Sequence, residues 1–289
     1  MTMINNDISQ WRSLSQIFSP SNFHQLIRDD SIKTTKKKIA RFFPEQLNNK
    51  KYGKVLSMLY SKLQEEYCSE YFFKNSLFNQ EFLNRYSVNT TTVFNEFKIG
   101  ASIADFVLLN GKVRIYEIKT DFDSLDKLEK QLSDYKQFAD EVYIVSSAKY
   151  ISKLLECYKD TTIGIIEFTP KYTFKERKKA GLNHAFFNHS VIFKTLRKAE
   201  YLEIVEDYFG YIPEVPNTKI FRECLGLLST IEVVAFQKLA FNKLKKRKIK
   251  CPELLLSDRT PYELKQICYT LDFNEKEYND LHNFLNKKI

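Results

Sequence analysis

Glycine is scarce in this 289-residue sequence: there are 7, where an average composition has about 7%. So few glycines argue against a β-sandwich with many tight turns and against a collagen-like or linker-dominated chain. No run approaches the ~20 apolar residues that a membrane span requires. The first positions are polar where a signal peptide would need an apolar stretch. We therefore expect a cytoplasmic protein with no membrane partner.

Residues and motifs for several common chemistries are also missing. The five cysteines are far apart, no C-x-x-C pair occurs, and only four histidines are present. A zinc site or a disulfide framework is therefore not expected, and the thiols should be reduced and mostly buried. The sequence contains no G-x-x-x-x-G-K-[ST], no G-x-G-x-x-G and no G-x-S-x-G. These absences exclude a P-loop, a dinucleotide-binding turn and a hydrolase elbow.

The sequence does contain enough apolar surface for a folded core, with 43% hydrophobic and 15% aromatic residues. Its net charge of +9 is unevenly distributed. Residues 33–54, 171–200 and 238–250 carry eight, eight and seven basic residues against one, two and no acids, whereas residues 93–169 carry 13 acids and 10 bases. Basic flanks around an acidic centre suit a polyanion held over a metal-binding cluster, although a solvated lysine-rich surface is the alternative.

Hydrophobic periodicity predicts a helix, three strands, and then a helix and a strand twice over. The predicted helices are 61–86, 124–138 and 149–158, and the predicted strands are 93–99, 104–109, 112–118, 142–145 and 163–168. This order predicts an α/β fold with a mixed sheet. We expect a helical N-terminal region over 1–60, a core over 61–170 and a basic helical C-terminal domain over 171–289. Asn217–Lys248 is expected to form one long helix or a kinked pair.

Charged residues occur in the predicted hairpin, where a buried sheet should be apolar. Asp105 and Glu117 are twelve residues apart. A three-residue loop, Asn110-Gly111-Lys112, would place them opposite each other, with Lys119 on the same face. A two-residue loop would instead place Asp105 opposite a tyrosine. The first register brings two carboxylates and one ammonium together at a strand end.

Two carboxylates held close together need a cation or a proton between them. Oxygen ligands of this kind suit Mg²⁺ or Mn²⁺, and the carbonyl of Ile118 is a plausible further ligand. Lys119 could orient or deprotonate an attacking water, or stabilise the charge that develops in the transition state. The simpler alternative is an ion pair at a sheet edge. The nearby Asp121, Asp123, Asp126 and Asp134 are expected to be helix-start and surface acids.

The arrangement D-x(11)-E-x-K across a hairpin, followed by an amphipathic helix, resembles the PD-(D/E)XK nuclease superfamily. The following helix carries Gln131-x-x-x-Tyr135, similar to a Q-x-x-x-Y motif of that superfamily's exonuclease-like branches. Residues 60–170 resemble more specifically a poorly characterised bacterial and phage family named after a myxobacterial open reading frame. One departure is Ala104, which stands where the proline of the motif would be.

This resemblance implies a restriction-endonuclease-like mixed sheet core with helices on both faces and helical flanks. It implies Asp105 and Glu117 as metal ligands, Lys119 as the catalytic lysine, Gln131 and Tyr135 as supporting site residues, and Glu96 as an additional acid. The expected function is a Mg²⁺- or Mn²⁺-dependent nuclease acting on nucleic acid, with DNA the expected substrate. Lys245, Lys246, Arg247 and Lys248 are expected to bind phosphates.

Two other functions remain open. The first is a non-catalytic DNA-binding or assembly subunit that keeps the nuclease fold. The second is a helical interaction protein in which the motif is accidental. Retention of Asp105, Glu117 and Lys119 together favours the enzyme. A homodimer and a complex with a partner protein are both compatible with the sequence.

Overall fold

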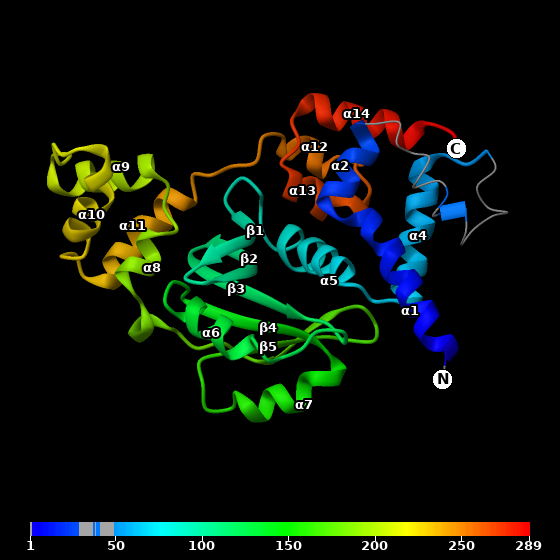
Figure 1. The fold of residues 1–289 in the computed structure, drawn as a ribbon, viewed down its shortest axis with the longest axis horizontal. Coiled ribbons are helices and arrows are strands. Elements are labelled where there is room, and N and C mark those ends of the chain that lie inside the picture. The colour runs from blue at the N-terminus through cyan, green and yellow to red at the C-terminus, as the bar shows by residue number, and fades with distance from the viewer. Residues whose placement is uncertain (1, 29–36, 38, 41–48) are drawn as a thin grey trace. The chain divides into compact units, whose positions relative to one another are not determined.

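The computed structural model describes residues 2–28, 37, 39–40 and 49–289 (Figure 1). The chain divides into two compact units: a helical unit of residues 1–85 with 249–289, and a sheet unit of residues 86–248. The boundaries between the units lie at 85/86 and 248/249, whereas the predicted boundaries were at 60/61 and 170/171. Residues 61–85 group with the C-terminal helices, and 171–248 group with the sheet. Much of the basic segment 33–54 and part of the predicted N-terminal region lie outside the described residues.

The helical unit is built from segments at both ends of the chain. Its described α-helices are α1 (Thr2–Ser15), α2 (Pro20–Arg28), α4 (Tyr52–Glu66), α5 (Glu70–Leu77), α12 (Pro252–Leu256), α13 (Lys265–Leu271) and α14 (Glu275–Asn286). The predicted single helix over 61–86 is wrong. The chain leaves the helix after Glu66, and Ser69 starts α5 by accepting a hydrogen bond from the Phe72 amide, so a cap interrupts the apolar periodicity. A π-helix over Phe78–Leu83 then extends α5.

The sheet unit contains the mixed sheet that the sequence predicts. Its strands are β1 (Thr92–Ile99), β2 (Ser102–Asn110), β3 (Lys112–Lys119), β4 (Glu141–Ser147), β5 (Gly164–Phe168) and β6 (Phe174–Lys178), and they lie side by side in chain order. β1, β2 and β3 are antiparallel, β3, β4 and β5 are parallel, and β6 is antiparallel to β5. The α/β fold class is confirmed. β6 was not predicted, because a helical C-terminal domain was expected from residue 171 onward.

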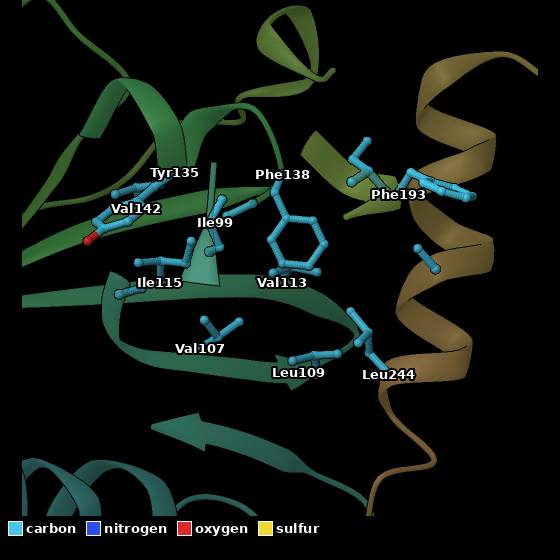
Figure 2. Close-up of a cluster of buried hydrophobic side chains, with 14 of the residues drawn as sticks. Ile99, Val107, Leu109, Val113, Ile115, Tyr135, Phe138, Val142, Phe193 and Leu244 are labelled. Atoms are coloured by element: carbon cyan, nitrogen blue, oxygen red, sulfur yellow. The ribbon is translucent and has the colours of Figure 1, made fainter. Parts of the chain in front are cut away.

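Helices α6 (Leu128–Lys136) and α7 (Ala148–Cys157) pack on one face of this sheet. Four further helices belong to the same unit: α8 (His189–Phe193), α9 (Lys198–Phe209), α10 (Asn217–Leu228) and α11 (Val233–Leu244). All of them share one hydrophobic core with the sheet, which joins Val107 and Ile115 to Phe138, Phe193 and Leu244 (Figure 2). The predicted helix over 217–248 is a pair, because Glu232 caps a second helix with its carboxylate.

The two ends of the sheet have different surroundings. Helices α8 to α11 gather near the end where β3 and β4 begin (Figure 1). There Gln237 of α11 donates a hydrogen bond to the carbonyl of Phe138 (3.2 Å), and Thr92 donates one to the carbonyl of Lys245 (2.9 Å). Lys119 lies at the other end of β3. None of the described helices is long and apolar enough to cross a membrane.

All five cysteines are free, as expected. Cys224 and Cys268 are buried, Cys68 and Cys251 are half-buried, and Cys157 is exposed. Fewer thiols are therefore buried than the sequence suggested.

Candidate active site

The β2–β3 hairpin has the register of the three-residue loop. Leu109 pairs with Val113 and Phe106 pairs with Tyr116, and Gly111 turns the chain with a φ of 66°. The pairing ends at Phe106 and Tyr116, and Asp105 and Glu117 are the next residues along the two strands. The alternative two-residue loop, which would pair Asp105 with Tyr116, is excluded.

The strands are irregular at the level of Asp105. Ala104 and Val107 are three residues apart, yet both belong to the core that includes α6, so the alternation of faces breaks between them. On β1 the corresponding residue, Glu96, has a φ of 50° and lies between the pairs Asn95–Phe106 and Phe97–Ala104. Such local irregularities re-aim side chains next to functional sites. Here the half-buried Asp105 carboxylate accepts a hydrogen bond from the Ile118 amide (2.8 Å), which holds it against β3.

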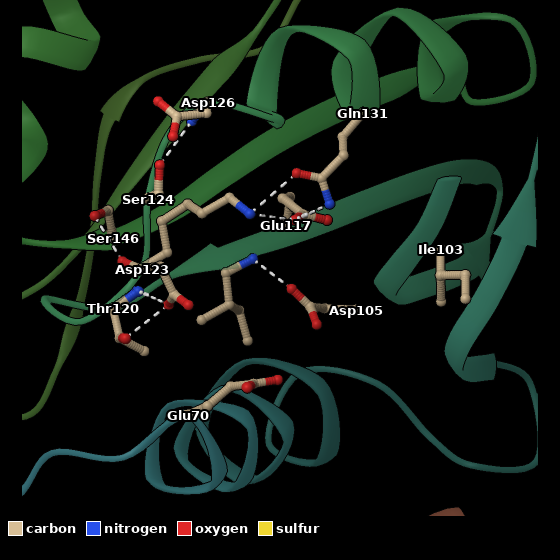
Figure 3. A network of polar contacts seen from close by, with 12 residues as sticks. Glu70, Ile103, Asp105, Glu117, Thr120, Asp123, Ser124, Asp126, Gln131 and Ser146 are labelled. Carbon is tan, nitrogen blue, oxygen red and sulfur yellow. Dashed lines mark hydrogen bonds and ion pairs between the residues drawn. The ribbon is translucent and has the colours of Figure 1, made fainter. Parts of the chain in front are cut away.

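Glu117 lies at the centre of a buried network (Figure 3). Its Oε1 accepts hydrogen bonds from Lys119 Nζ (2.8 Å) and Gln131 Nε2 (2.7 Å), and its Oε2 lies 2.8 Å from the Tyr135 hydroxyl. Lys119 Nζ also donates to Gln131 Oε1 (3.0 Å). The Glu117 side chain is 3% exposed and that of Lys119 is 11% exposed, so water contributes little to their solvation. The structure thus brings together four of the predicted residues and places Asp105 beside them.

Helix α6 holds this network and the start of β2 at once. The Tyr135 hydroxyl lies 2.7 Å from the carbonyl of Ile103, two residues before Asp105. One residue earlier on the helix, Asp134 accepts hydrogen bonds from the Ser102 hydroxyl (2.6 Å) and the Ala101 amide (3.2 Å). The expectation that Asp134 is a surface acid is therefore wrong: it positions the β1–β2 turn. Its partners are more than thirty residues away in the chain, so no local pattern marks it.

The charges in this network are not balanced. Burial raises the pKa of Glu117, the charge of Asp105 raises it further, and Lys119 only partly opposes this. Burial and the charge of Glu117 likewise raise the pKa of Tyr135, which stays protonated. The Tyr135 hydroxyl has one proton but lies between the Ile103 carbonyl and Glu117, and both are acceptors when Glu117 is ionised. If Glu117 carries a proton, it can donate to the Tyr135 hydroxyl, which then donates its own proton to the Ile103 carbonyl.

A cation would relieve the same imbalance. Asp105, Glu117 and the carbonyl of Ile118 supply hard oxygen donors, the type that Mg²⁺ and Mn²⁺ prefer. Mg²⁺ commonly binds proteins through one or two carboxylates and keeps several waters, so this donor set fits it. Glu96 is exposed. Across the described residues no group of three or more His, Cys, Asp or Glu could hold a metal, so Glu96 does not complete a three-carboxylate site.

The basic run after α11 lies away from this network. Its first residue contacts Thr92, at the opposite end of β1 to β3 from Lys119. Arg247 is engaged internally: its guanidinium binds Glu200 (2.5 and 2.6 Å) and the carbonyl of Thr195 (3.1 Å). Lys248 donates to the carbonyl of Asn89 (2.9 Å), while Lys246 is exposed. The four residues therefore do not form the uniform phosphate-binding run that was expected.

Comparison with known proteins identifies the family. Residues 63–266 match the family described as Bacteriophage P4 protein cII, and the chain belongs to this family. This segment contains the whole sheet unit and therefore every residue of the network above.

One curated relative is Protein cII of Enterobacteria phage P4. It is 28% identical over 163 residues, which are 55% of this chain and 57% of that protein, so the match spans little more than half of the relative. Among solved structures, the SPO1766 protein of unknown function from Silicibacter pomeroyi is 14% identical and covers 32% of this chain and 62% of its own, with a TM-score of 0.26. A likeness this weak carries no argument about the fold.

Proposed function

We propose that this protein is a metal-dependent nuclease that hydrolyses phosphodiester bonds in nucleic acid, with DNA the expected substrate. The observation that carries the proposal is the buried Glu117–Lys119 pair with a second carboxylate, Asp105, held beside it by the Ile118 amide. The resemblance of these residues and of Gln131 and Tyr135 to the PD-(D/E)XK superfamily supports it further. The protein would act in the cytoplasm, with nucleic acid as its partner.

Each residue has a distinct part in this proposal. Asp105, Glu117 and the Ile118 carbonyl would hold Mg²⁺ or Mn²⁺, which when bound lowers the pKa of water and stabilises charge on a phosphoryl oxygen. Lys119 would orient the attacking water or stabilise the charge developing on the phosphate. Gln131 bonds both Glu117 and Lys119, and Tyr135 bonds Glu117, so α6 keeps the carboxylate and the ammonium aligned.

A second candidate is a nucleic-acid-binding or assembly subunit that does not cleave. One observation favours it: the oxygens of Glu117 already have three polar partners, Lys119, Gln131 and Tyr135. A buried network with this many internal partners can serve simply to fix the fold, without any catalytic role. Both candidates bind nucleic acid, but only the first cleaves it.

The deciding experiment is a cleavage assay on labelled linear duplex DNA, single-stranded DNA and RNA, with Mg²⁺, Mn²⁺ or EDTA. Lys119→Met, purified identically, controls for contaminating nucleases. The proposal predicts cleavage by the wild type that needs a divalent cation and disappears in the variant. Binding without cleavage would select the second candidate. The absence of both binding and cleavage would reject both.

A further inference from the structure

The edge strand β6 carries basic residues that the proposed active site does not use. Its pairing with β5 is regular from Phe174 to Glu176 and is then shifted by a bulge at Arg177. Arg177 binds the carboxylate of Glu167 on the neighbouring strand β5. Lys175 pairs directly with Glu167, so it lies on the same face as Glu167 and the guanidinium that binds it. Lys175 and Arg177 are both exposed, as is Lys179 just after the strand.

This face of β6 is the face of the sheet that carries Lys119. The strand register forms a continuous row, in which Lys119 pairs with Ser146, Ser146 with Glu167, and Glu167 with Lys175. Directly paired residues point to the same side of a sheet. Lys175 therefore lies level with Lys119, three strands away. At about 4.8 Å per strand, this separation is roughly 14 Å.

The charge at this row and in the segments on either side of β6 suits a polyanion. Lys171, Lys175 and Lys179 are exposed, and none of them forms an ion pair with the described residues. Glu167, the acid on this face of β5, is neutralised by Arg177. Glu176 points to the other face, where its carboxylate lies 3.4 Å from the Tyr143 hydroxyl. The basic face of β6 thus has no neighbouring carboxylate left to balance it within β5 and β6.

We propose that Lys175 and Lys179, assisted by Lys171 in the preceding turn, bind phosphates of the nucleic acid strand whose reacting phosphate lies at Asp105, Glu117 and Lys119. This inference rests on the proposed function and adds the path of the substrate. A spacing of roughly 14 Å corresponds to about four nucleotides of a duplex strand, at ~3.4 Å of helix axis each. Lysines act as point charges on the backbone, so this contact is independent of base sequence.

The test compares two charge-matched double variants. Lys175→Gln with Lys179→Gln removes two charges from β6. Lys219→Gln with Arg222→Gln removes two from the exposed face of α10 and serves as the control. Binding of a fluorescein-labelled 24-base-pair duplex is measured by anisotropy in EDTA, which prevents cleavage, over a series of salt concentrations. Thermal melting of each variant checks that it is folded.

The β6 variant should bind about five- to tenfold more weakly near 0.1 M salt. The slope of log K against log salt should flatten by about 1 to 2, since each lost phosphate contact removes ~0.9. The control should behave like the wild type. Wild-type binding with an unchanged β6 variant, or with equal losses in both variants, would overturn this inference and leave the proposed nuclease standing. A wild type that neither binds nor cleaves would reject the proposed function itself.

Discussion

Two buried glutamates on adjacent strands of the sheet, Glu117 on β3 and Glu141 on β4, have opposite electrostatic surroundings. Both are nearly inaccessible, at 2% and 5% exposure. Burial alone would raise the pKa of Glu141, but hydrogen bonds from Lys112 (2.7 Å) and Arg114 (2.7 Å) outweigh it and lower the pKa. Burial raises the pKa of Glu117, and Asp105 raises it further.

The difference lies in the number of cations around each carboxylate. Glu141 has two cationic partners, so its charge is satisfied within the protein and the cluster is an ion pair at the start of β4. Glu117 has one lysine and a second carboxylate nearby, so two ionised carboxylates would face a single cation and one negative charge would be uncompensated. A Glu–Lys contact in a strand therefore says little by itself. The balance of charge around it distinguishes a structural pair from a candidate cation site.

The largest effect should be on cleavage. Asp105→Ala, Glu117→Ala and Lys119→Ala should each lower the cleavage rate on the order of 10³-fold or more, because each removes a ligand or the transition-state cation from groups that act as a unit. The matched control is Glu141→Ala, which breaks the other glutamate cluster and should leave the rate within a few-fold. Rates are compared under single-turnover conditions. Near-full activity in any of the three site variants would contradict the assignment of Asp105, Glu117 and Lys119 as active-site residues.

The second-largest effect should be on the free energy of unfolding, to which Glu141 contributes through its two cationic partners. Glu141→Gln should lower the free energy of unfolding by about 1–3 kcal/mol at neutral pH, because Lys112 and Arg114 lose a charged hydrogen-bond acceptor. A lowered pKa means that this stabilisation is present above the ordinary value of 4.5 and is lost as pH falls through the folded-state pKa. Urea unfolding from pH 7 down to pH 3 should show the variant and the wild type converging. The exposed Glu156→Gln should track the wild type throughout.

Cation affinity should depend on pH through Glu117. Its raised pKa means that a proton must leave before a cation binds, so affinity should increase with pH by up to about tenfold per unit below that pKa. Calorimetry in buffers of different ionisation enthalpy measures the proton released. Glu117→Gln has no proton to lose and should show no release at this site. Affinity that stays constant as pH falls from 8 through the ordinary glutamate pKa of 4.5 would contradict the charge imbalance.

The smallest effect concerns Glu96. Its φ of 50° is unfavourable for a residue with a Cβ, so Glu96→Gly should raise stability by up to about 1 kcal/mol. Lys98→Gly, at an exposed β1 position without a positive φ, should instead lower stability. Thermal melting compares the two variants. Cleavage by Glu96→Gly should stay within a few-fold of the wild type, and a loss of more than tenfold would make Glu96 part of the site.

The hairpin and the helix behind it could be predicted because their information is local. The even separation of Asp105 and Glu117, together with Asn110-Gly111, fixes the loop and the register. The four-residue spacing of Gln131 and Tyr135 places both on one side of α6. Both features depend only on the periods of strands and helices.

The features that were missed depend on distant partners. The basic run containing Arg247 has no acid within it, and the Glu200 that binds Arg247 lies 47 residues away. The break in alternation at Asp105 involves a second strand and the left-handed backbone of Glu96. Charged residues fill both faces of β6, which lies at the sheet edge and lacks the apolar alternation by which a strand is predicted.

The most direct test of the difference between the two glutamates is a crystal structure of the wild-type protein grown with Mn²⁺, with data collected to record anomalous scattering. We expect a Mn²⁺ peak within ligand distance of the carboxylates of both Asp105 and Glu117, with none at Glu141. Saturating Mn²⁺ with no peak between Asp105 and Glu117, and with the Glu117–Lys119 pair unchanged, would show that this cluster is a structural ion pair like that of Glu141.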